Sequence, residues 1–255
     1  MKLLSYLLVL ICFLLIIPNF LATNIVEDKS GITRKEKFDP ALVRLNSLSK
    51  LEAYVDSVAV TKNILDSPLA YAVEAEDIVS RRFYHKYATQ DLKDNWIASV
   101  CQKLTGYYLS SKVTAEDILK KPYGYCGQQN AVLMELLLKK KFNYRVLYFP
   151  HHFVFQSYIN NHWCYFDADQ EPTIQPYQRT SEKWLNSTDS LSIAYNLNRT
   201  TAGNVFGTPG DYKFGKINEI QGKRVQIFQS ITKVLSKIAF LLPLILVFYL
   251  ERNKK

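Results

Sequence analysis

The 255-residue chain lacks several patterns that would point to common classes of function. It has no internal repeat and no low-complexity segment, which excludes a repeat array and a largely disordered chain. It has no C-x-x-C pair and no H-x-x-x-H pair, so we expect no metal and no cofactor. It also has no basic aromatic stripe and no DNA-reading motif, so nucleic acid is not an expected partner. With 48% hydrophobic and 22% charged residues, the chain can bury a sizeable core.

The net charge of +9 is concentrated near the C-terminus. Residues 211–255 contain nine Lys or Arg and three acidic residues, which gives +6, and Lys2 adds one, so residues 3–210 contribute about +2. This distribution is typical of membrane topology signals, together with a juxtamembrane stretch that could contact anionic lipid headgroups.

The N-terminus has an apolar run, residues 3–17, behind Lys2 and before Pro18. This pattern predicts a signal peptide or an N-terminal anchor over residues 1–23. Phe20 and Leu21 are bulky where a cleavage site favours small residues. Cleavage and retention of the segment therefore both stay open.

The C-terminus has a second apolar run, residues 238–250, followed by a basic cluster. Extension back to Ile231 gives the roughly 20 residues of a spanning helix, so we expect a transmembrane helix over 231–250. A buried or interfacial terminal helix is the alternative. Positive residues favour the cytoplasm, which predicts a cytoplasmic tail over 251–255 and a central domain on the extracytoplasmic side, periplasmic or extracellular.

Cysteine is scarce, and three of the four residues fall in the part expected to be exported: Cys101, Cys126 and Cys164, with Cys12 in the apolar run. An odd number in an oxidising compartment implies at least one free thiol if the others pair. Cys101 and Cys164 would be the pair, which leaves Cys126 free; equally, all three could be reduced.

The middle of the chain predicts helices followed by strands. Residues 39–103 have mainly helical spacing, with Pro40 in a first turn, and in residues 91–104 one apolar face is expected to pack in the core. Another apolar helix is expected to start at Cys126. The members of the apolar face in 91–104 are Leu92, Trp96, Ile97, Val100 and Leu104.

Three segments after this helix are rich in β-branched and aromatic residues: 144–149, 152–159 and 162–169. Asn160 and Asn161 separate the last two as a turn, which predicts an antiparallel meander and an α+β fold. Residues 170–215 are rich in Pro, Asn, Thr and Gly and are expected to wrap the surface, with one helical stretch near 182–186.

Cys126 is a candidate nucleophile, because the start of a helix stabilises a thiolate through unpaired N–H groups and the helix dipole. Such a nucleophile needs a base and a group that orients the base. Pairing through the turn at 160–161 would bring His152 close to Asp167 and Asp169, which share one face of their strand. A helix packed on that sheet could then present Cys126 to His152.

The chain from Trp96 to Pro172 resembles the transglutaminase-like domain of the papain-type cysteine enzymes. The resemblance rests on five elements in order: DNWIASVCQKLTGYY, YGYCGQQNAVLMELLLKK, YRVLYF, HHFVFQSY and WCYFDAD. It implies a papain-like core over 92–172 within a domain of 38–215. It also implies Cys126 as nucleophile, His152 as general acid and base, and Asp167, four residues after a tryptophan, as the group that holds the imidazole.

Several assignments stay open beside this one. His151 competes with His152, and Asp169 competes with Asp167, although spacing from Trp163 favours His152 and Asp167. His85 and His162 are expected to lie on the surface or in turns. Trp96 is either a core residue or, as in some relatives, a support for the oxyanion. Where the family has a glycine after the nucleophile helix, Asn143 could provide the left-handed C-cap.

The resemblance implies an exported, membrane-tethered enzyme that transfers acyl groups from amides of a protein or peptide. Cross-linking, deamidation and peptide hydrolysis are all compatible with it. The alternative is a catalytically silent transglutaminase-like domain that serves as a binding or assembly module at the membrane surface.

Overall fold

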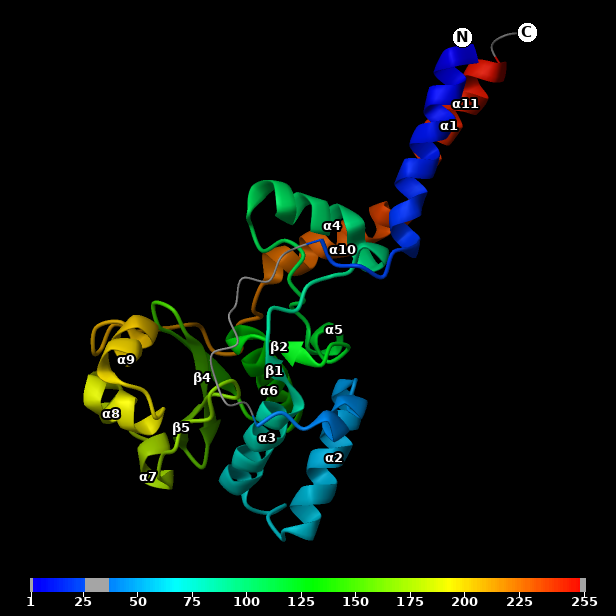
Figure 1. The fold of residues 1–255 in the computed structure, drawn as a ribbon. Helices are drawn as coiled ribbons and strands as arrows, with labels where there is room; N and C mark the ends of the chain where they lie inside the picture. Colours follow the sequence, from blue (N-terminus) through cyan, green and yellow to red (C-terminus); the bar gives the residue numbers. More distant parts are fainter. Residues whose placement is uncertain (1, 26–36, 253–255) are drawn as a thin grey trace. The chain divides into compact units, whose positions relative to one another are not determined.

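The computed structural model describes residues 2–25 and 37–252, and it has an α+β fold (Figure 1). The chain divides into two compact units. Unit 1 comprises Met1–Lys29, Thr89–Lys112 and Gly222–Lys255, and unit 2 comprises Ser30–Ala88 and Val113–Gln221. The predicted α+β class is confirmed.

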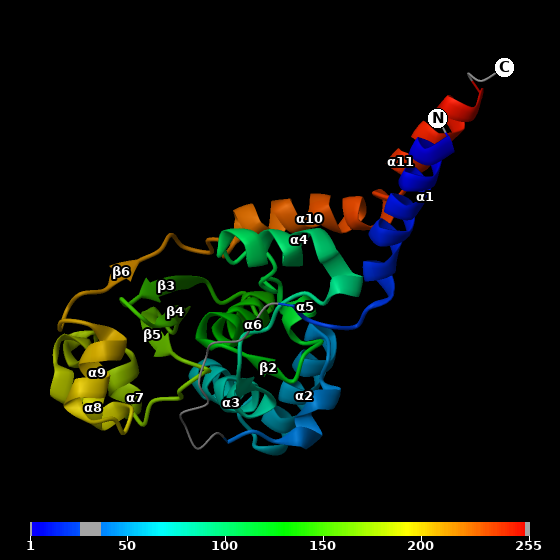
Figure 2. The same ribbon diagram turned by 45° about the horizontal axis from the view of Figure 1, so that its top comes forward.

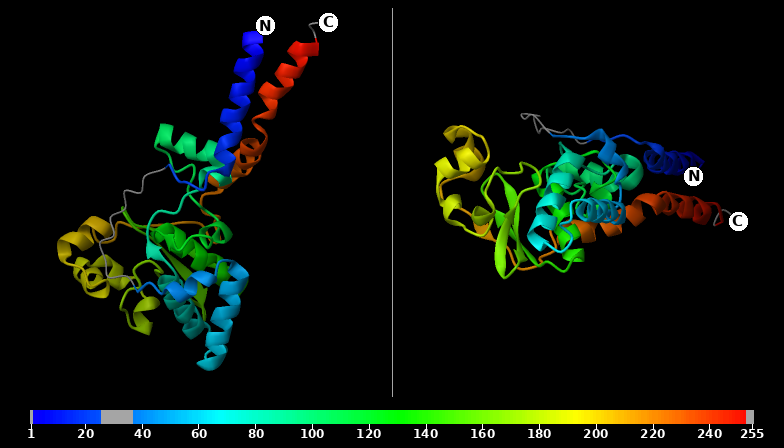
Figure 3. Two further views of the ribbon diagram at one scale, coloured as in Figure 1. Left: turned by 45° about the vertical axis from the view of Figure 1, so that its right-hand side comes forward. Right: turned by 90° about the horizontal axis from the view of Figure 1, so that it is seen from below.

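Unit 1 is helical and brings the two ends of the chain together. Its elements are α1 (Lys2–Ile16), η1 (Ile17–Phe20), α4 (Leu92–Thr105), α10 (Lys223–Ile238) and α11 (Leu241–Arg252). In Figures 2 and 3, α1 lies beside α11 and runs antiparallel to it, and in Figure 2 α4 lies beside α10. Ser5 Oγ donates to Glu251 Oε1 at 3.0 Å, so the start of α1 meets the end of α11.

Residues just after α1 are built into unit 1 by hydrogen bonds. The N–H groups of Leu92 and Lys93 at the start of α4 donate to the carbonyls of Thr23 and Leu21, each at 2.9 Å. Asn19 Nδ2 donates to the Ser236 carbonyl of α10 at 3.0 Å. The carbonyls of Leu21 and Thr23 thus supply acceptors for N–H groups in the first turn of α4, which have no acceptor within the helix.

One helix of the described residues, over Leu3–Phe20, is long and apolar enough to cross a membrane or to act as a signal sequence. At the other end, the expected single helix over 231–250 is two helices, α10 and α11, bent by 41° at Ala239 and Phe240. The predicted tail residues Lys254 and Lys255 lie outside the described residues, as do residues 26–36.

Unit 2 begins with helices and ends with a small sheet and short helices. The helical elements are η2 (Pro40–Arg44), α2 (Leu48–Thr61), α3 (Pro68–Arg82), α5 (Ala115–Ile118), α6 (Cys126–Lys139), α7 (Pro176–Arg179), η3 (Lys183–Asn186), α8 (Thr188–Ala194) and α9 (Arg199–Phe206). The strands are β1 (Tyr84–His85), β2 (Tyr123–Gly124), β3 (Tyr144–Tyr148), β4 (Phe153–Ile159), β5 (His162–Phe166) and β6 (Lys213–Phe214).

The main sheet of unit 2 has the order β5-β4-β3-β6 and is antiparallel throughout. Asn160 and Asn161, with φ of 51° and 64°, form the two-residue turn between β4 and β5. Both residues take the left-handed conformation that such turns require and asparagine tolerates. The predicted meander and its turn are confirmed. A separate two-stranded sheet pairs β1 with β2 in parallel, immediately before α6.

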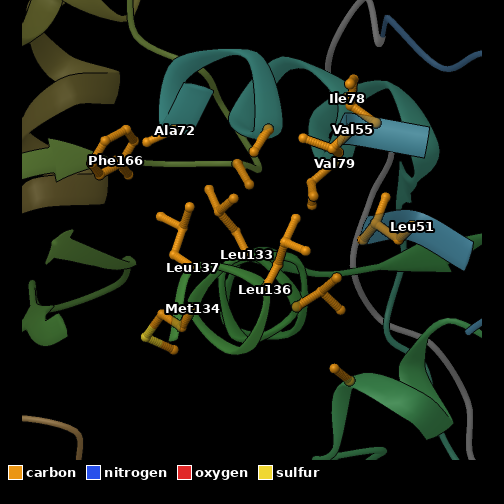
Figure 4. Packing of buried hydrophobic residues seen from close by; sticks show 14 of the residues in the cluster. Leu51, Val55, Ala72, Ile78, Val79, Leu133, Met134, Leu136, Leu137 and Phe166 are labelled. Atoms are coloured by element: carbon orange, nitrogen blue, oxygen red, sulfur yellow. The ribbon is translucent and has the colours of Figure 1, made fainter. Parts of the chain in front are cut away.

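Helix α6 is at the centre of the core of unit 2. Leu133, Leu136 and Leu137 have no exposed surface, and Figure 4 shows them pointing toward Val79 and Val55 of the neighbouring helices α3 and α2. On another side, α6 packs on β4. Because α6 is held between the helical layer and the sheet, the position of its first residue, Cys126, is fixed by the core.

Arg82 at the end of α3 is buried, and among the described residues its partners are main-chain carbonyls. Its Nη2 donates to the Leu119 carbonyl at 2.7 Å, its Nη1 to Lys121 at 3.2 Å and its Nε to Leu45 at 3.3 Å. Burial lowers the pKa of Arg82 to about 10. The side chain satisfies three main-chain carbonyls, because such groups are costly to bury without a donor.

Residues 170–215 are more ordered than their composition predicts. In place of one helical stretch they form η3 and three short helices, with a second apolar cluster beneath them. Gly207, at φ +77°, ends α9 where a Cβ atom would lie 2.5 Å from Cγ of Pro150. The cluster comprises Leu147, Phe149, Val154, Tyr165, Trp184, Leu185, Leu191, Ala194, Tyr195, Ala202 and Phe206.

Two local predictions are wrong, and one open alternative is decided. The apolar face of 91–104 does not pack in the core as a whole, because Leu104 is 81% exposed and the buried face of α4 contains Asn95 instead. Of the two states left open for Cys101, Cys126 and Cys164, the structure has the reduced one, since all four cysteines are free. After α6, Lys141, with φ of 65°, takes the left-handed conformation expected of Asn143.

Candidate functional site

Cys126 is the first residue of α6, as predicted. Tyr125 precedes it in an extended conformation, and the Gln128 side chain accepts the Tyr125 N–H at 3.3 Å, which stabilises the start of the helix. The N–H groups of Cys126 and Gly127 lie in the first turn, where the helix itself offers no acceptor. The thiol is half-buried. A Cβ atom on Gly127 would lie 3.3 Å from the Tyr125 hydroxyl, so glycine lets that ring lie close to the helix start.

His152 and Asp167 form a buried pair. His152 Nε2 lies 2.6 Å from Asp167 Oδ2, and the two side chains are 2% and 0% exposed. The predicted approach of these residues through the 160–161 turn is confirmed. The competing His151 is exposed. Of the two competing carboxylates, Asp167 contacts His152, whereas Asp169 contacts His85.

The Cys126 side chain lies close enough to His152 to act on its titration by hydrogen bonding and by charge. Since Nε2 of the ring faces Asp167, Nδ1 is the nitrogen left for the sulfur. The three predicted site residues are thus brought together in the order Cys126, His152, Asp167.

The electrostatics of the pair favour an ionised form. Burial by itself lowers the pKa of His152, but the charge and hydrogen bond of Asp167, with the Cys126 side chain, outweigh burial and raise this pKa well above 6.5. Burial raises the pKa of Asp167, but His152, Asn130 and Tyr195 outweigh it and lower this pKa below its usual value. The site is therefore arranged for an imidazolium beside a carboxylate.

Other donors surround the Asp167 carboxylate. Tyr195 Oη donates to Oδ2 at 3.0 Å. Asn130 Nδ2 and the N–H groups of Asp169 and Gln170 donate to Oδ1 at 3.3, 3.1 and 3.3 Å. Several donors to one carboxylate stabilise its charged form and fix its orientation.

A second layer holds the Asp167 main chain. Its N–H donates to Glu76 Oε1 of α3 at 2.7 Å, and Glu76 Oε2 lies 2.7 Å from Arg179 Nη2. Arg179 Nη1 also donates to the Tyr165 carbonyl at 2.8 Å. Burial raises the pKa of Glu76 despite the opposing effect of Arg179. Thus α3 and α7 both support the position of Asp167.

Aromatic rings enclose the His152 imidazole. The rings of Phe206 and Tyr195 meet it edge to face at centroid distances of 5.4 and 6.2 Å. The Tyr195 hydroxyl lies 2.5 Å from that of Tyr165. Residues 170–215, expected only to cover the surface, therefore contribute to the walls and hydrogen bonds of the site.

A second histidine and carboxylate lie next to this site. His85 of β1 has its Nδ1 2.6 Å from Asp169 Oδ1, and Gln129 Nε2 donates to the same oxygen at 2.9 Å. The expectation that His85 is a surface residue is thus wrong in part, since its side chain is 32% exposed and engaged. His162 starts β5 and is exposed, as predicted.

Sequence reasoning missed Asn130, Tyr195 and Glu76. Asn130 is the last of three consecutive polar residues near the start of α6, directly before its apolar stretch, whereas Glu76 lies in α3 and Tyr195 directly follows α8. Trp96 belongs to unit 1, where its indole N–H donates to the Ser236 carbonyl at 3.0 Å.

Comparison of the chain with protein-family models, with curated proteins and with solved structures finds no match.

Proposed function

We propose that unit 2 is a papain-like, transglutaminase-like domain that transfers acyl groups from amides of proteins or peptides. The observation that carries this proposal is the chain of contacts from Cys126 through His152 to the buried Asp167. A buried carboxylate and a buried imidazole offset each other's cost of desolvation, so the pair alone could be structural. A purely structural pair, however, would not require a half-buried thiol at a helix start beside it.

The proposed reaction starts with the ion pair of a Cys126 thiolate and a His152 imidazolium. The sulfur attacks the amide carbonyl and forms a tetrahedral intermediate, whose oxyanion is held by the first-turn N–H groups of Cys126 and Gly127. His152 gives its proton to the leaving amine, so the C–N bond breaks and a thioester forms. Asp167 keeps the imidazole oriented throughout and stabilises its positive charge whenever it is protonated.

The second half-reaction consumes the thioester. His152, now neutral, takes a proton from the incoming nucleophile, and the Cys126 thiolate is the leaving group. Water as nucleophile gives hydrolysis or deamidation, whereas a primary amine such as a lysine side chain gives a cross-link.

The membrane part of the proposal places unit 2 outside the cytoplasm, tethered by unit 1. The support is the antiparallel arrangement of α1 and α11, which brings the basic ends of the sequence, Lys2 and Arg252, to one end of the helix pair. Positive residues are retained on the cytoplasmic side, so both ends give the same orientation.

The test measures alkylation of Cys126 by iodoacetamide, resolved from the other three cysteines by mass spectrometry of its peptide. We expect Cys126 to react faster near neutral pH than a model thiol peptide, and His152→Ala to abolish the excess. His151→Ala is the matched control, because that exposed neighbour is expected to leave the rate unchanged. Equal rates in His152→Ala and the wild type would contradict the activated nucleophile.

The same protein separates the outcomes of the reaction. A glutamine peptide with a labelled amine reports cross-linking, ammonia release without amine incorporation reports deamidation, and a cleaved peptide reports proteolysis. A reactive Cys126 with none of these products over a broad peptide set would favour the binding-module alternative.

A further inference from the structure

Helix α10 has its polar face inside and its apolar face outside. Ser236 is 1% exposed, and Gln229 and Thr232 are also buried, whereas Ile231 is 57% exposed. This is the reverse of a helix on the surface of a soluble domain, which buries its apolar stripe. The exposed apolar residues of α10 are Ile227, Ile231, Val234, Leu235 and Ile238.

The buried polar residues of α10 have partners within unit 1. Gln229 Nε2 donates to the Leu109 and Ser111 carbonyls at 2.8 and 2.6 Å. Asn95 Nδ2 of α4 donates to Thr232 Oγ1 at 2.8 Å. Polar contacts of this kind between helices, with apolar surfaces outside, are typical of helices in a lipid environment. We call these contacts between α4 and α10 the polar seam.

Helix α4 also turns polar residues toward the interior of the unit, together with Leu92 and Ala98. Asn95, Ser99 and Gln102 are buried in the unit, while Leu104 is exposed on the opposite side. Tyr107 and Tyr108, which follow the helix after Gly106, are also largely exposed. Tyrosine beside an exposed apolar surface is typical of the level of lipid headgroups.

Charge and length indicate which partner covers these faces. Residues 89–112 and 222–238 contain seven Lys or Arg and two Asp, a net charge of +5, which complements anionic lipid headgroups. The 12 residues of α11 extend about 18 Å, short of the roughly 30 Å of a bilayer core. Helix α10 is joined to α11 at the bend, so the short α11 holds the end of α10 close to the membrane.

We propose that α4 and α10 lie in the interfacial layer of an anionic bilayer, with the outward apolar face of α10 and Leu104 of α4 among the lipids and the polar seam between the two helices. Leu104 thus contacts lipid rather than the core of the domain. The inference rests on the membrane anchoring proposed above and does not depend on the chemistry of Cys126.

The test places a photoactivatable diazirine side chain at single positions of the full chain. Ile231 and Leu104 are the lipid-facing positions, and their exposed neighbours Ser230 and Lys103 are matched controls on other sides of the same helices. The protein is reconstituted into vesicles of phosphatidylcholine with about 30% phosphatidylglycerol. Only chains that float with the vesicles are irradiated, and lipid adducts are measured by mass spectrometry.

We expect phospholipid adducts at Ile231 and Leu104 and several-fold fewer at the two control positions. Equal labelling within each pair of neighbours, or no adduct at either lipid-facing position, would overturn the inference while leaving anchoring intact. Adducts between two protein chains at Ile231 and Leu104 would overturn it in favour of a second copy on this surface. Chains that fail to float would refute the anchoring itself.

Discussion

Replacement of Asp167 by asparagine tests the electrostatics of the site with little change in shape. The introduced amide can keep its oxygen toward Asn130 and the two N–H donors that contact Oδ1 in the wild type. Its nitrogen would then face His152 Nε2, where a donor favours the neutral imidazole. The ionised pair with His152 is lost.

The size of the effect follows from the hydrogen bond that changes. A hydrogen bond to a charged group contributes about 1.5–3 kcal/mol. Its loss lowers the pKa of His152 and, at 1.36 kcal/mol per factor of ten, shifts the equilibrium from the thiolate–imidazolium pair toward the neutral thiol and imidazole by about 10- to 100-fold. We expect the excess alkylation rate of Cys126 near neutral pH to fall with the thiolate population.

The assay is the pH profile of Cys126 alkylation in Asp167→Asn beside the wild type. The rise in rate with pH, where the reactive thiolate forms, should shift to higher pH in the variant, because the thiolate loses the support of a stable imidazolium. Asp169→Asn is the control, because that carboxylate contacts His85 instead. An unchanged profile in Asp167→Asn, or the same shift in both variants, would refute the reasoning.

Three further predictions concern stability, measured as the free energy of unfolding by urea in detergent micelles. Arg82→Leu removes the hydrogen bonds to the Leu45, Leu119 and Lys121 carbonyls and should lower the free energy of unfolding by about 3–5 kcal/mol. Its neighbour Arg81→Leu loses half-exposed ion pairs and should lower it by under about 1 kcal/mol, and equal costs would contradict this account. The pair His152–Asp167 should stabilise the fold most between about pH 4 and 6.5. The stability from the raised His152 pKa is lost as pH rises through the folded value, and the stability from the lowered Asp167 pKa is lost as pH falls through the folded value. A double variant, His152→Ala with Asp167→Ala, should remove this pH dependence, and a dependence that persists in the variant would belong to other groups. Gly207→Ala meets both a positive φ and a neighbouring proline ring and should cost about 1–3 kcal/mol, while a cost near zero would mean that the turn relaxes freely.

Much of the site could be predicted because its signals are local. The helix start at Cys126, the turn at Asn160 and Asn161 and the alternation along the strands each depend on a few neighbouring residues. Together they set the register that brings His152 to Asp167. A single antiparallel pairing was enough to relate two residues 15 positions apart.

The environment of Asp167 could not be predicted, because it depends on distant packing. Tyr195 comes from the end of α8, and Glu76 comes from α3, 91 residues before Asp167. Neither position has a sequence pattern that differs from an ordinary helix. Their side chains reach Asp167 only because the second apolar cluster and helix α3 pack beside it in the folded unit.

Helix α4 illustrates a different limit. Its spacing correctly predicts two faces, one apolar and one polar, but periodicity does not tell which face is buried. An apolar face has the same pattern whether it meets a protein core or lipid. Leu104 was therefore assigned to the wrong environment, and the burial of Asn95 was not anticipated.

The contact between Asn19 and Ser236 has a consequence for biosynthesis. The donor is made among the first residues of the chain, but its acceptor is made only after residues 30–88 and 113–221 have been translated. Because domains generally fold as units during synthesis, unit 2 has all of its residues before unit 1 has its last helices. Helix α1 and η1 must therefore remain without their partners in α10 and α11 while unit 2 is translated, and unit 1 is completed after unit 2.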